Sequence, residues 1–169
     1  MFPIFHIALP LLIFEIPRIK DRFKVNRFAL LIGSIIPDIM DKPLLFLELD
    51  SGRGFSHSLL FIVASFLFLF FVTKGNTVIT FSFQFGVITH FILDLPHLPW
   101  LYPFVSYDYE IIDDPIAHWI KTMVEEPIVS VTEILGAFIL IFIIYNNKLY
   151  RFKEVTRYLN TKKDHEKNK

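Results

Sequence analysis

The chain has 169 residues, no cysteine and a formal net charge of zero. The lack of cysteine excludes disulfides and thiolate metal sites, and the balanced charge gives no reason to expect a nucleic-acid partner. With 53% hydrophobic residues and a mean hydropathy of +0.49, the chain is more apolar than an ordinary soluble domain, which favours a membrane protein.

Five apolar stretches are predicted to be helices, and together they predict an all-α fold, a small polytopic transmembrane bundle. They are residues 2–17, 28–37, 58–73, 77–96 and 128–145. A spanning helix needs about 20 residues. Only residues 77–96 reach that length, so the others are expected to be thin or partial spans. The second stretch could begin at Val25, or continue through a break into residues 43–49 as a re-entrant piece.

The region between the last two stretches is rich in tyrosine and tryptophan, as expected at a membrane–water boundary. Within it, Asp113-Asp114-Pro115 is typical of a helix start, with an acid at the cap and proline in the first turn. Apolar residues then recur at helical spacing. They are Ile116, Trp119, Ile120 and Met123. We therefore expect a short amphipathic helix on the membrane interface.

Lysine and arginine are concentrated in residues 18–27 and in the tail, residues 146–169. If residues 18–27 are cytoplasmic, alternating spans leave only Lys42, Arg53 and Lys121 outside. The positive-inside rule thus predicts an inner-membrane (plasma-membrane) protein with its N-terminus outside and its C-terminus cytoplasmic. Residues 1–145 would form the membrane-embedded helical domain, and residues 146–169 a basic, solvated cytoplasmic tail.

This topology brings six polar residues, spread between positions 6 and 94, to the outer face. They are His6, Asp38, Asp41, His57, His90 and Asp94. Histidine nitrogens and carboxylate oxygens are ligands of divalent metals, so the pattern predicts a polar metal site at that face.

His90 and Asp94 are the sharpest element, because positions i and i+4 share a helix face and can grip one ion. An unpaired carboxylate costs about 2.5–3.5 kcal/mol at a bilayer centre and less near an interface, which a cation would offset. Each residue also has a structural alternative. The pair could be hydrogen-bonded without metal, His57 could be a helix-start residue, and His6 a lone polar group. Asp38 and Asp41 could be turn or cap residues. Weaker single candidates are His97, His118 and Glu133.

The motifs Pro37-Asp38-Ile39-Met40-Asp41, Arg53-Gly54-Phe55-Ser56-His57-Ser58 and His90-Phe91-Ile92-Leu93-Asp94, with His6 before them, resemble the YdjM type of membrane proteins. That family is regarded as metal-dependent hydrolases, distantly similar to zinc-dependent phospholipase C and S1/P1 nuclease. The resemblance implies that His57, His90, Asp94 and one of Asp38 or Asp41 hold a first metal. It also implies that His6 and Asp94 together bind a second metal, so that the site would hold one or two Zn²⁺ ions. The further His-x-x-x-Glu pair of the phospholipases is missing from the sequence, so no three-metal site is expected.

These observations predict a membrane-bound metal-dependent hydrolase that acts on a phosphoester or ester of a lipid-like substrate through a metal-activated water. Asp41 or Asp38 would act as general base, and Arg53 would hold a phosphate oxygen. One alternative is a non-enzymatic scaffold or partner-binding protein with a structural metal. Another is an ion pathway, for which the inner helix halves offer only Glu15 and small polar groups.

Overall fold

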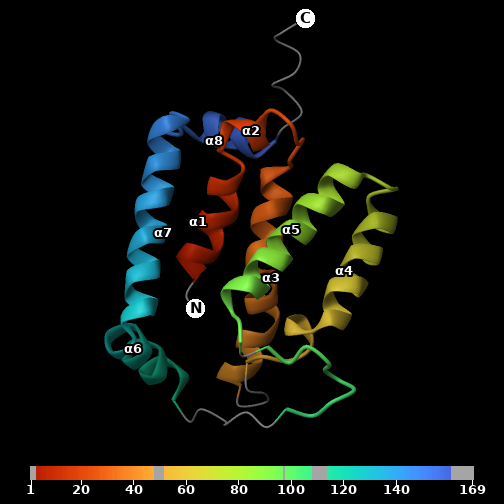
Figure 1. Ribbon diagram of the computed structural model, residues 1–169, viewed down its shortest axis with the longest axis vertical. Helices are drawn as coiled ribbons and strands as arrows, with labels where there is room; N and C mark the ends of the chain where they lie inside the picture. The colour runs from red at the N-terminus through yellow and green to blue at the C-terminus, as the bar shows by residue number, and fades with distance from the viewer. Residues whose placement is uncertain (1–2, 48–51, 97, 108–113, 161–169) are drawn as a thin grey trace, which may run out of the picture.

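The computed structural model describes residues 3–47, 52–96, 98–107 and 114–160 (Figure 1). These residues form eight α-helices and one 3-10 helix, with no strand among them, which confirms the predicted all-α fold. The elements are α1 (Pro3–Ile13), α2 (Pro17–Lys20), α3 (Arg27–Phe46), η1 (Phe55–His57), α4 (Leu59–Val72), α5 (Thr77–Leu93), α6 (Pro115–Glu125), α7 (Pro127–Asn146) and α8 (Phe152–Leu159).

Short polar side chains set the starts of four helices, because each accepts a hydrogen bond from an otherwise unpaired backbone N–H of the first turn. The capping residues are Asn26 for α3, Ser58 for α4, Asn76 for α5 and Asp114 for α6. The cap at Asp114, followed by Pro115, confirms the predicted helix start, while Asp113 lies outside the described residues.

The second apolar stretch is longer than predicted. Helix α3 continues without a break through Pro37 and Pro43 to Phe46, so the alternative of a re-entrant piece is wrong. A proline inside a helix removes one backbone hydrogen bond and usually ends it. Here the Ser56 hydroxyl donates to the Pro37 carbonyl oxygen at 2.7 Å, which ties the proline turn to η1. Asp38 and Asp41 therefore sit on a rigid helix rather than in a turn.

Helices α3 and α5 cross so closely that their backbones are in contact. A Cβ atom on Gly33 would lie 2.0 Å from the Phe83 carbonyl oxygen, and one on Gly86 would lie 2.3 Å from the Leu30 carbonyl oxygen. Both positions therefore require glycine, as is common where helices pack tightly in membranes. The close crossing therefore brings Asp38, which follows Gly33 on α3, near His90, which follows Gly86 on α5.

Helix α1 docks on α7 through a buried carboxylate. Glu133 accepts hydrogen bonds from the backbone N–H groups of Ile4 and Phe5, both at 3.2 Å, and so caps the first turn of α1. A carboxylate is favourable there because the N-terminus of a helix carries partial positive charge. One turn along α7, a Cβ on Gly136 would lie 2.9 Å from the Phe5 nitrogen. Glu133 is thus a helix cap that holds α1, and His6 with it, in place.

The Glu133→Gln variant is expected to melt about 2–6 °C below wild type, since an amide carries one acceptor oxygen and no charge to satisfy two N–H groups. Thermal unfolding in detergent measures this. The matched control is Glu125→Gln on α6, where the carboxylate is largely exposed. Equal melting of the two variants would show that the cap contributes nothing.

Several polar side chains lie buried beside the apolar core of this bundle, and many large apolar ones are exposed on its outside. His6, His57 and His90 are at most 1% exposed, whereas Phe71 on α4 and Phe138 on α7 are 74% and 64% exposed. A water-soluble protein shows the opposite arrangement, because apolar surface of this extent is unfavourable in water. The outer faces of α4 and α7 are suited to a hydrocarbon solvent.

One helix in the described chain, α7, is long and apolar enough to cross a membrane, and only 17% of its most apolar window is buried. The prediction that residues 77–96 are the full-length span is wrong, since α5 has 17 residues and α7 has 20. At 1.5 Å per residue, α7 measures about 30 Å. The other apolar helices, α1, α4 and α5, are shorter. A bundle that spans the bilayer several times therefore stays a prediction.

Part of the predicted solvated tail is folded. Residues 152–159 form α8, and the Tyr158 hydroxyl donates to the Glu15 carboxylate at 2.8 Å. Burial and this hydrogen bond raise the pKa of the Tyr158 phenol, so it remains a donor. Glu15 also pairs with Arg27 at 3.3 Å and with Lys20 at 3.2 Å. Glu15, the acidic residue considered for an ion pathway, thus joins α8 and α3 to the segment after α1.

Helices α2 and α8 lie together at the top of Figure 1, far from α6. We call this part, formed by residues 14–27 and 147–160, the basic end. It unites the first basic segment with the described part of the basic tail. The first basic segment and the described part of the tail are therefore on one side of the fold, while the sidedness in the membrane stays a prediction.

Candidate metal centre

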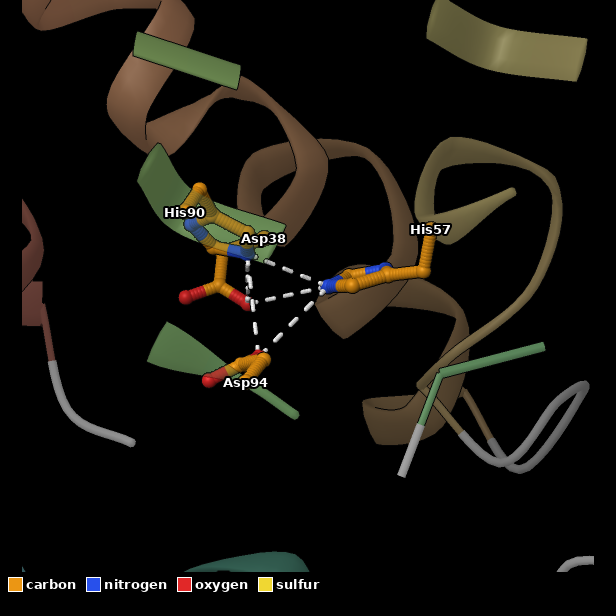
Figure 2. Close-up of side chains that lie close together, drawn as sticks. All are labelled: Asp38, His57, His90 and Asp94. Atoms are coloured by element: carbon orange, nitrogen blue, oxygen red, sulfur yellow. Dashed lines mark hydrogen bonds and ion pairs between the residues drawn. The ribbon is translucent and has the colours of Figure 1, made fainter. Parts of the chain in front are cut away.

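Four side chains from three helical segments and one helix end converge on a single point (Figure 2). They lie toward the end of the bundle at which α6 is found. Asp38 comes from α3, His57 from η1, His90 from α5, and Asp94 from the residue that ends α5. One nitrogen or oxygen atom from each lies within 4.8 Å of the others. His57, His90 and Asp94 are buried and Asp38 is partly exposed.

The distances within this group suit a tetrahedral ion. The two Nε2 atoms of His57 and His90 are 3.3 Å apart, and they lie 3.7 and 3.8 Å from Asp38 Oδ1. Asp94 Oδ2 is 3.9 Å from His57 Nε2 and 3.7 Å from His90 Nε2. Zinc–ligand bonds of 2.0–2.2 Å give tetrahedral edges of about 3.3–3.6 Å. These five distances are within a few tenths of an ångström of such edges, and the two carboxylate oxygens lie within 4.8 Å of each other.

The hydrogen bond made by Nδ1 of each histidine determines whether its Nε2 can bind a metal ion. His57 Nδ1 lies 2.8 Å from the Asp41 carboxylate, and His90 Nδ1 lies 2.8 Å from the Ser34 carbonyl oxygen. Both partners can only accept, so each Nδ1 carries a proton and donates it. In the neutral imidazoles both Nε2 atoms are then acceptors, and they face each other and two carboxylates. Two imidazole nitrogens and two carboxylate oxygens that converge in this way form a ligand set suited to a divalent cation.

Asp41 lies outside the group of four, behind His57. Its carboxylate accepts the His57 Nδ1–H and also the backbone N–H of Gly54 at 2.8 Å. A carboxylate on the outer nitrogen of a histidine fixes the ring and raises its basicity, as found around many metal ions. Of the two aspartates between which the sequence could not choose, Asp38 faces the centre and Asp41 orients His57.

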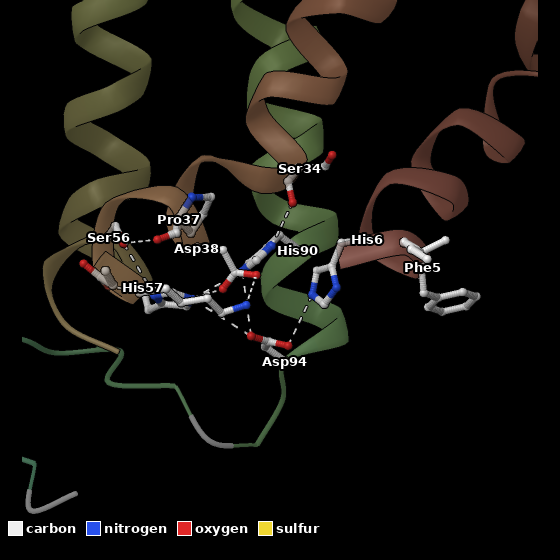
Figure 3. A network of polar contacts seen from close by, with 12 residues as sticks. Phe5, His6, Ser34, Pro37, Asp38, Ser56, His57, His90 and Asp94 are labelled. Carbon is white, nitrogen blue, oxygen red and sulfur yellow. Dashed lines mark hydrogen bonds and ion pairs between the residues drawn. The ribbon is translucent and has the colours of Figure 1, made fainter. Parts of the chain in front are cut away.

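Each carboxylate of the group divides its two oxygens between the centre and a neighbouring side chain (Figure 3). Asp94 directs Oδ2 inward, while its Oδ1 lies 3.2 Å from His6 Nε2. Asp38 directs Oδ1 inward, and its Oδ2 pairs with Lys42 Nζ at 2.6 Å. His6 is therefore in contact with the group without being one of the four.

Sequence reasoning missed the contribution of Lys42. Its Nζ atom also lies over the Trp119 ring of α6, 5.2 Å from the ring centre, so it joins Asp38 to the amphipathic helix. The signal that could have found it is the i, i+4 spacing of Asp38 and Lys42 on one helix. Ser34 and Ser56, which hold His90 and the Pro37 turn, gave no comparable signal because single serines are common in helices and loops.

The remaining candidates lie elsewhere. Arg53 is half-buried in the segment before η1 and is not one of the four. His118 is exposed on α6, and Glu133 caps α1. His97 lies outside the described residues.

Comparison with known proteins agrees with the resemblance drawn from the motifs. The model of the family described as YdjM inner membrane protein matches residues 1–153, which is most of the chain. No curated protein and no solved structure gives a match.

Proposed function

The chain belongs to the YdjM inner membrane protein family, and on this premise we propose that it is a membrane-bound, metal-dependent hydrolase. The observation that carries the proposal is the set of four converging acceptor atoms with both outer histidine nitrogens anchored by acceptors. Two neutral imidazoles and two carboxylates balance the charge of one divalent ion. Nitrogen and carboxylate donors at these distances suit zinc.

Asp38, His57, His90 and Asp94 would hold this ion. A zinc ion bound there supplies Lewis acidity that makes a water molecule nucleophilic near neutral pH. Asp41 keeps His57 in the tautomer whose Nε2 faces the centre. Asp41 accepts two hydrogen bonds, and Asp38 faces the ion with one oxygen and pairs with Lys42 through the other. We therefore propose that Asp38, the most exposed of the four, orients the water as a ligand of the ion and does not act as a free base.

The substrate we propose is a phosphoester or ester of a lipid-like molecule. Arg53 lies four residues before His57, and its planar guanidinium suits a phosphate oxygen. The exposed Ile116 and Ile120 of α6 offer an apolar surface at the same end of the bundle. An amphiphile could thereby enter from the membrane with its polar group toward the four side chains.

The test is turnover by detergent-purified, zinc-loaded protein on a chromogenic phosphodiester and on phospholipids, with release of product as the readout. Wild type is expected to hydrolyse at least one of these esters, and Asp38→Asn to lose the activity. Asp21→Asn, an exposed aspartate of the basic end, is the matched control and should match wild type. Turnover in Asp38→Asn at the wild-type rate would contradict the proposal.

The second candidate function is a non-enzymatic scaffold with a structural metal. It is favoured by one observation: the group offers four protein ligands in a largely buried setting, which is typical of closed structural sites. For this function, chelation lowers the melting temperature while no ester is hydrolysed by the zinc-loaded protein.

Replacing Asp41 with asparagine is expected to weaken zinc binding about 10- to 100-fold with the fold intact, because the outer partner of His57 loses its charge. A competitive titration against a chromogenic chelator measures the affinity, again with Asp21→Asn as control. Unchanged affinity in Asp41→Asn would remove the orienting role from Asp41.

A further inference from the structure

A second site of different character lies toward the basic end. It is a groove of about 730 Å³ between the end of α1 with α2 on one side and the first three turns of α5 on the other. Its walls are mainly apolar, with Ile13, Phe14 and Ile19 facing Val78, Phe81 and Phe85. The volume is typical of a site for a small amphiphile or a lipid chain.

The polar residues along the walls are largely engaged within the protein. Ser82 donates to the Val78 carbonyl oxygen at 2.6 Å and accepts the Asn26 N–H at 2.9 Å. The Gln84 amide donates to the Ile62 carbonyl oxygen at 2.9 Å. Thr77, the third such residue, is exposed at the first turn of α5. The groove body therefore suits a hydrocarbon chain.

Two cations line the same groove. Arg22 and Lys24 are exposed, and within the described residues neither makes an ion pair. Their neighbours Lys20 and Arg27 both pair with Glu15. The hydrogen bond from Asn26 to Ser82 fixes this segment against α5, so the two charges are held at the groove. The charge pattern complements a molecule with an anionic head and an apolar tail.

We propose that this groove binds an anionic phospholipid, with an acyl chain between α1 and α5 and the phosphate at Arg22 and Lys24. Membership of an inner membrane protein family supplies the setting, since such lipids surround the protein. Val78 and His90 are 12 positions apart on α5, about 18 Å along the helix. The lipid site is thus separate from the candidate metal centre and independent of any hydrolase activity.

The test uses the full chain in nanodiscs that contain phosphatidylglycerol or phosphatidylcholine with a photoreactive group in one acyl chain, and maps labelled peptides by mass spectrometry. Labelling of α1 and α5 peptides is expected with phosphatidylglycerol in excess over phosphatidylcholine. The double variant Arg22→Ala/Lys24→Ala should weaken binding of phosphatidylglycerol about 10- to 30-fold. Arg18→Ala/Lys153→Ala removes two exposed cations of the basic end outside the groove and should bind as wild type.

Val78→Trp fills the groove without changing charge and should abolish labelling of α1 while the melting temperature stays within a few degrees of wild type. Equal labelling by both lipids would overturn the proposal and leave non-specific boundary lipid. Equal losses in the two double variants would overturn it as well. Cross-links between two copies of the chain at α1 and α5 would also overturn it, because they would show that the groove is an interface between copies.

Discussion

The Gly86→Ala variant is expected to melt roughly 6–12 °C below wild type. The added methyl group would lie 2.3 Å from the Leu30 carbonyl oxygen and 2.7 Å from the Ser34 nitrogen, and both are backbone atoms that cannot rotate away. Helices α3 and α5 would have to separate, and overpacking of this kind destabilises by about 3 kcal/mol, or roughly 6–12 °C in melting temperature. Thermal unfolding and size-exclusion chromatography of the detergent-purified protein measure the effect.

Val63→Ile is the control for this experiment. It also adds one methyl group, but on α4 at a position that is 55% exposed. The control is expected to melt like wild type. A Gly86→Ala protein that also melts like wild type would mean that the two helices do not cross as closely as described.

His90→Ala is expected to abolish both the stabilisation by zinc and any hydrolysis, while leaving a folded protein. The change removes one Nε2 from the group of four and one donor to the Ser34 carbonyl oxygen. A ligand at 1,000 times its Kd stabilises by about 4 kcal/mol, so wild type should melt roughly 8–16 °C higher with saturating zinc. The variant should show no shift.

His118→Ala provides the matched control, because His118 is a histidine on α6 that is exposed and not in the group. Its zinc-dependent shift should equal that of wild type. A wild-type shift in His90→Ala would place the zinc elsewhere, and a lost shift in His118→Ala would indicate binding by surface histidines.

The helices were predictable where hydrophobicity alone decides. The stretches that became α4, α5 and α7 are predominantly apolar along their length, and capping signals fixed starts such as that at Asp114. The continuation of α3 was not predictable, because a proline normally ends a helix and the contact by which Ser56 ties this turn to η1 comes from a distant loop. Nor was the docking of α8, which depends on Glu15 meeting Tyr158 from the far end of the chain.

The residues of the site could be predicted from the sequence, but the way their atoms face one another could not. All six predicted residues lie in one connected network, because four apolar segments carry their polar residues at the same end. Which atoms face the centre depends on helix rotation and ring orientation. Asp38 and Asp41 lie three positions apart on one helix face and bind opposite nitrogens of His57. Spacing alone could not assign Nε2 to one and Nδ1 to the other.

The central claim is that Asp38, His57, His90 and Asp94 bind one divalent metal ion. The most direct test is the metal content of detergent-purified wild type and Asp94→Asn, measured by plasma mass spectrometry after zinc loading and removal of the excess. We predict about one zinc per chain in wild type and almost none in the folded variant. Folded wild-type protein without bound metal, even after zinc is offered, would contradict the claim and reduce the cluster to a hydrogen-bond network.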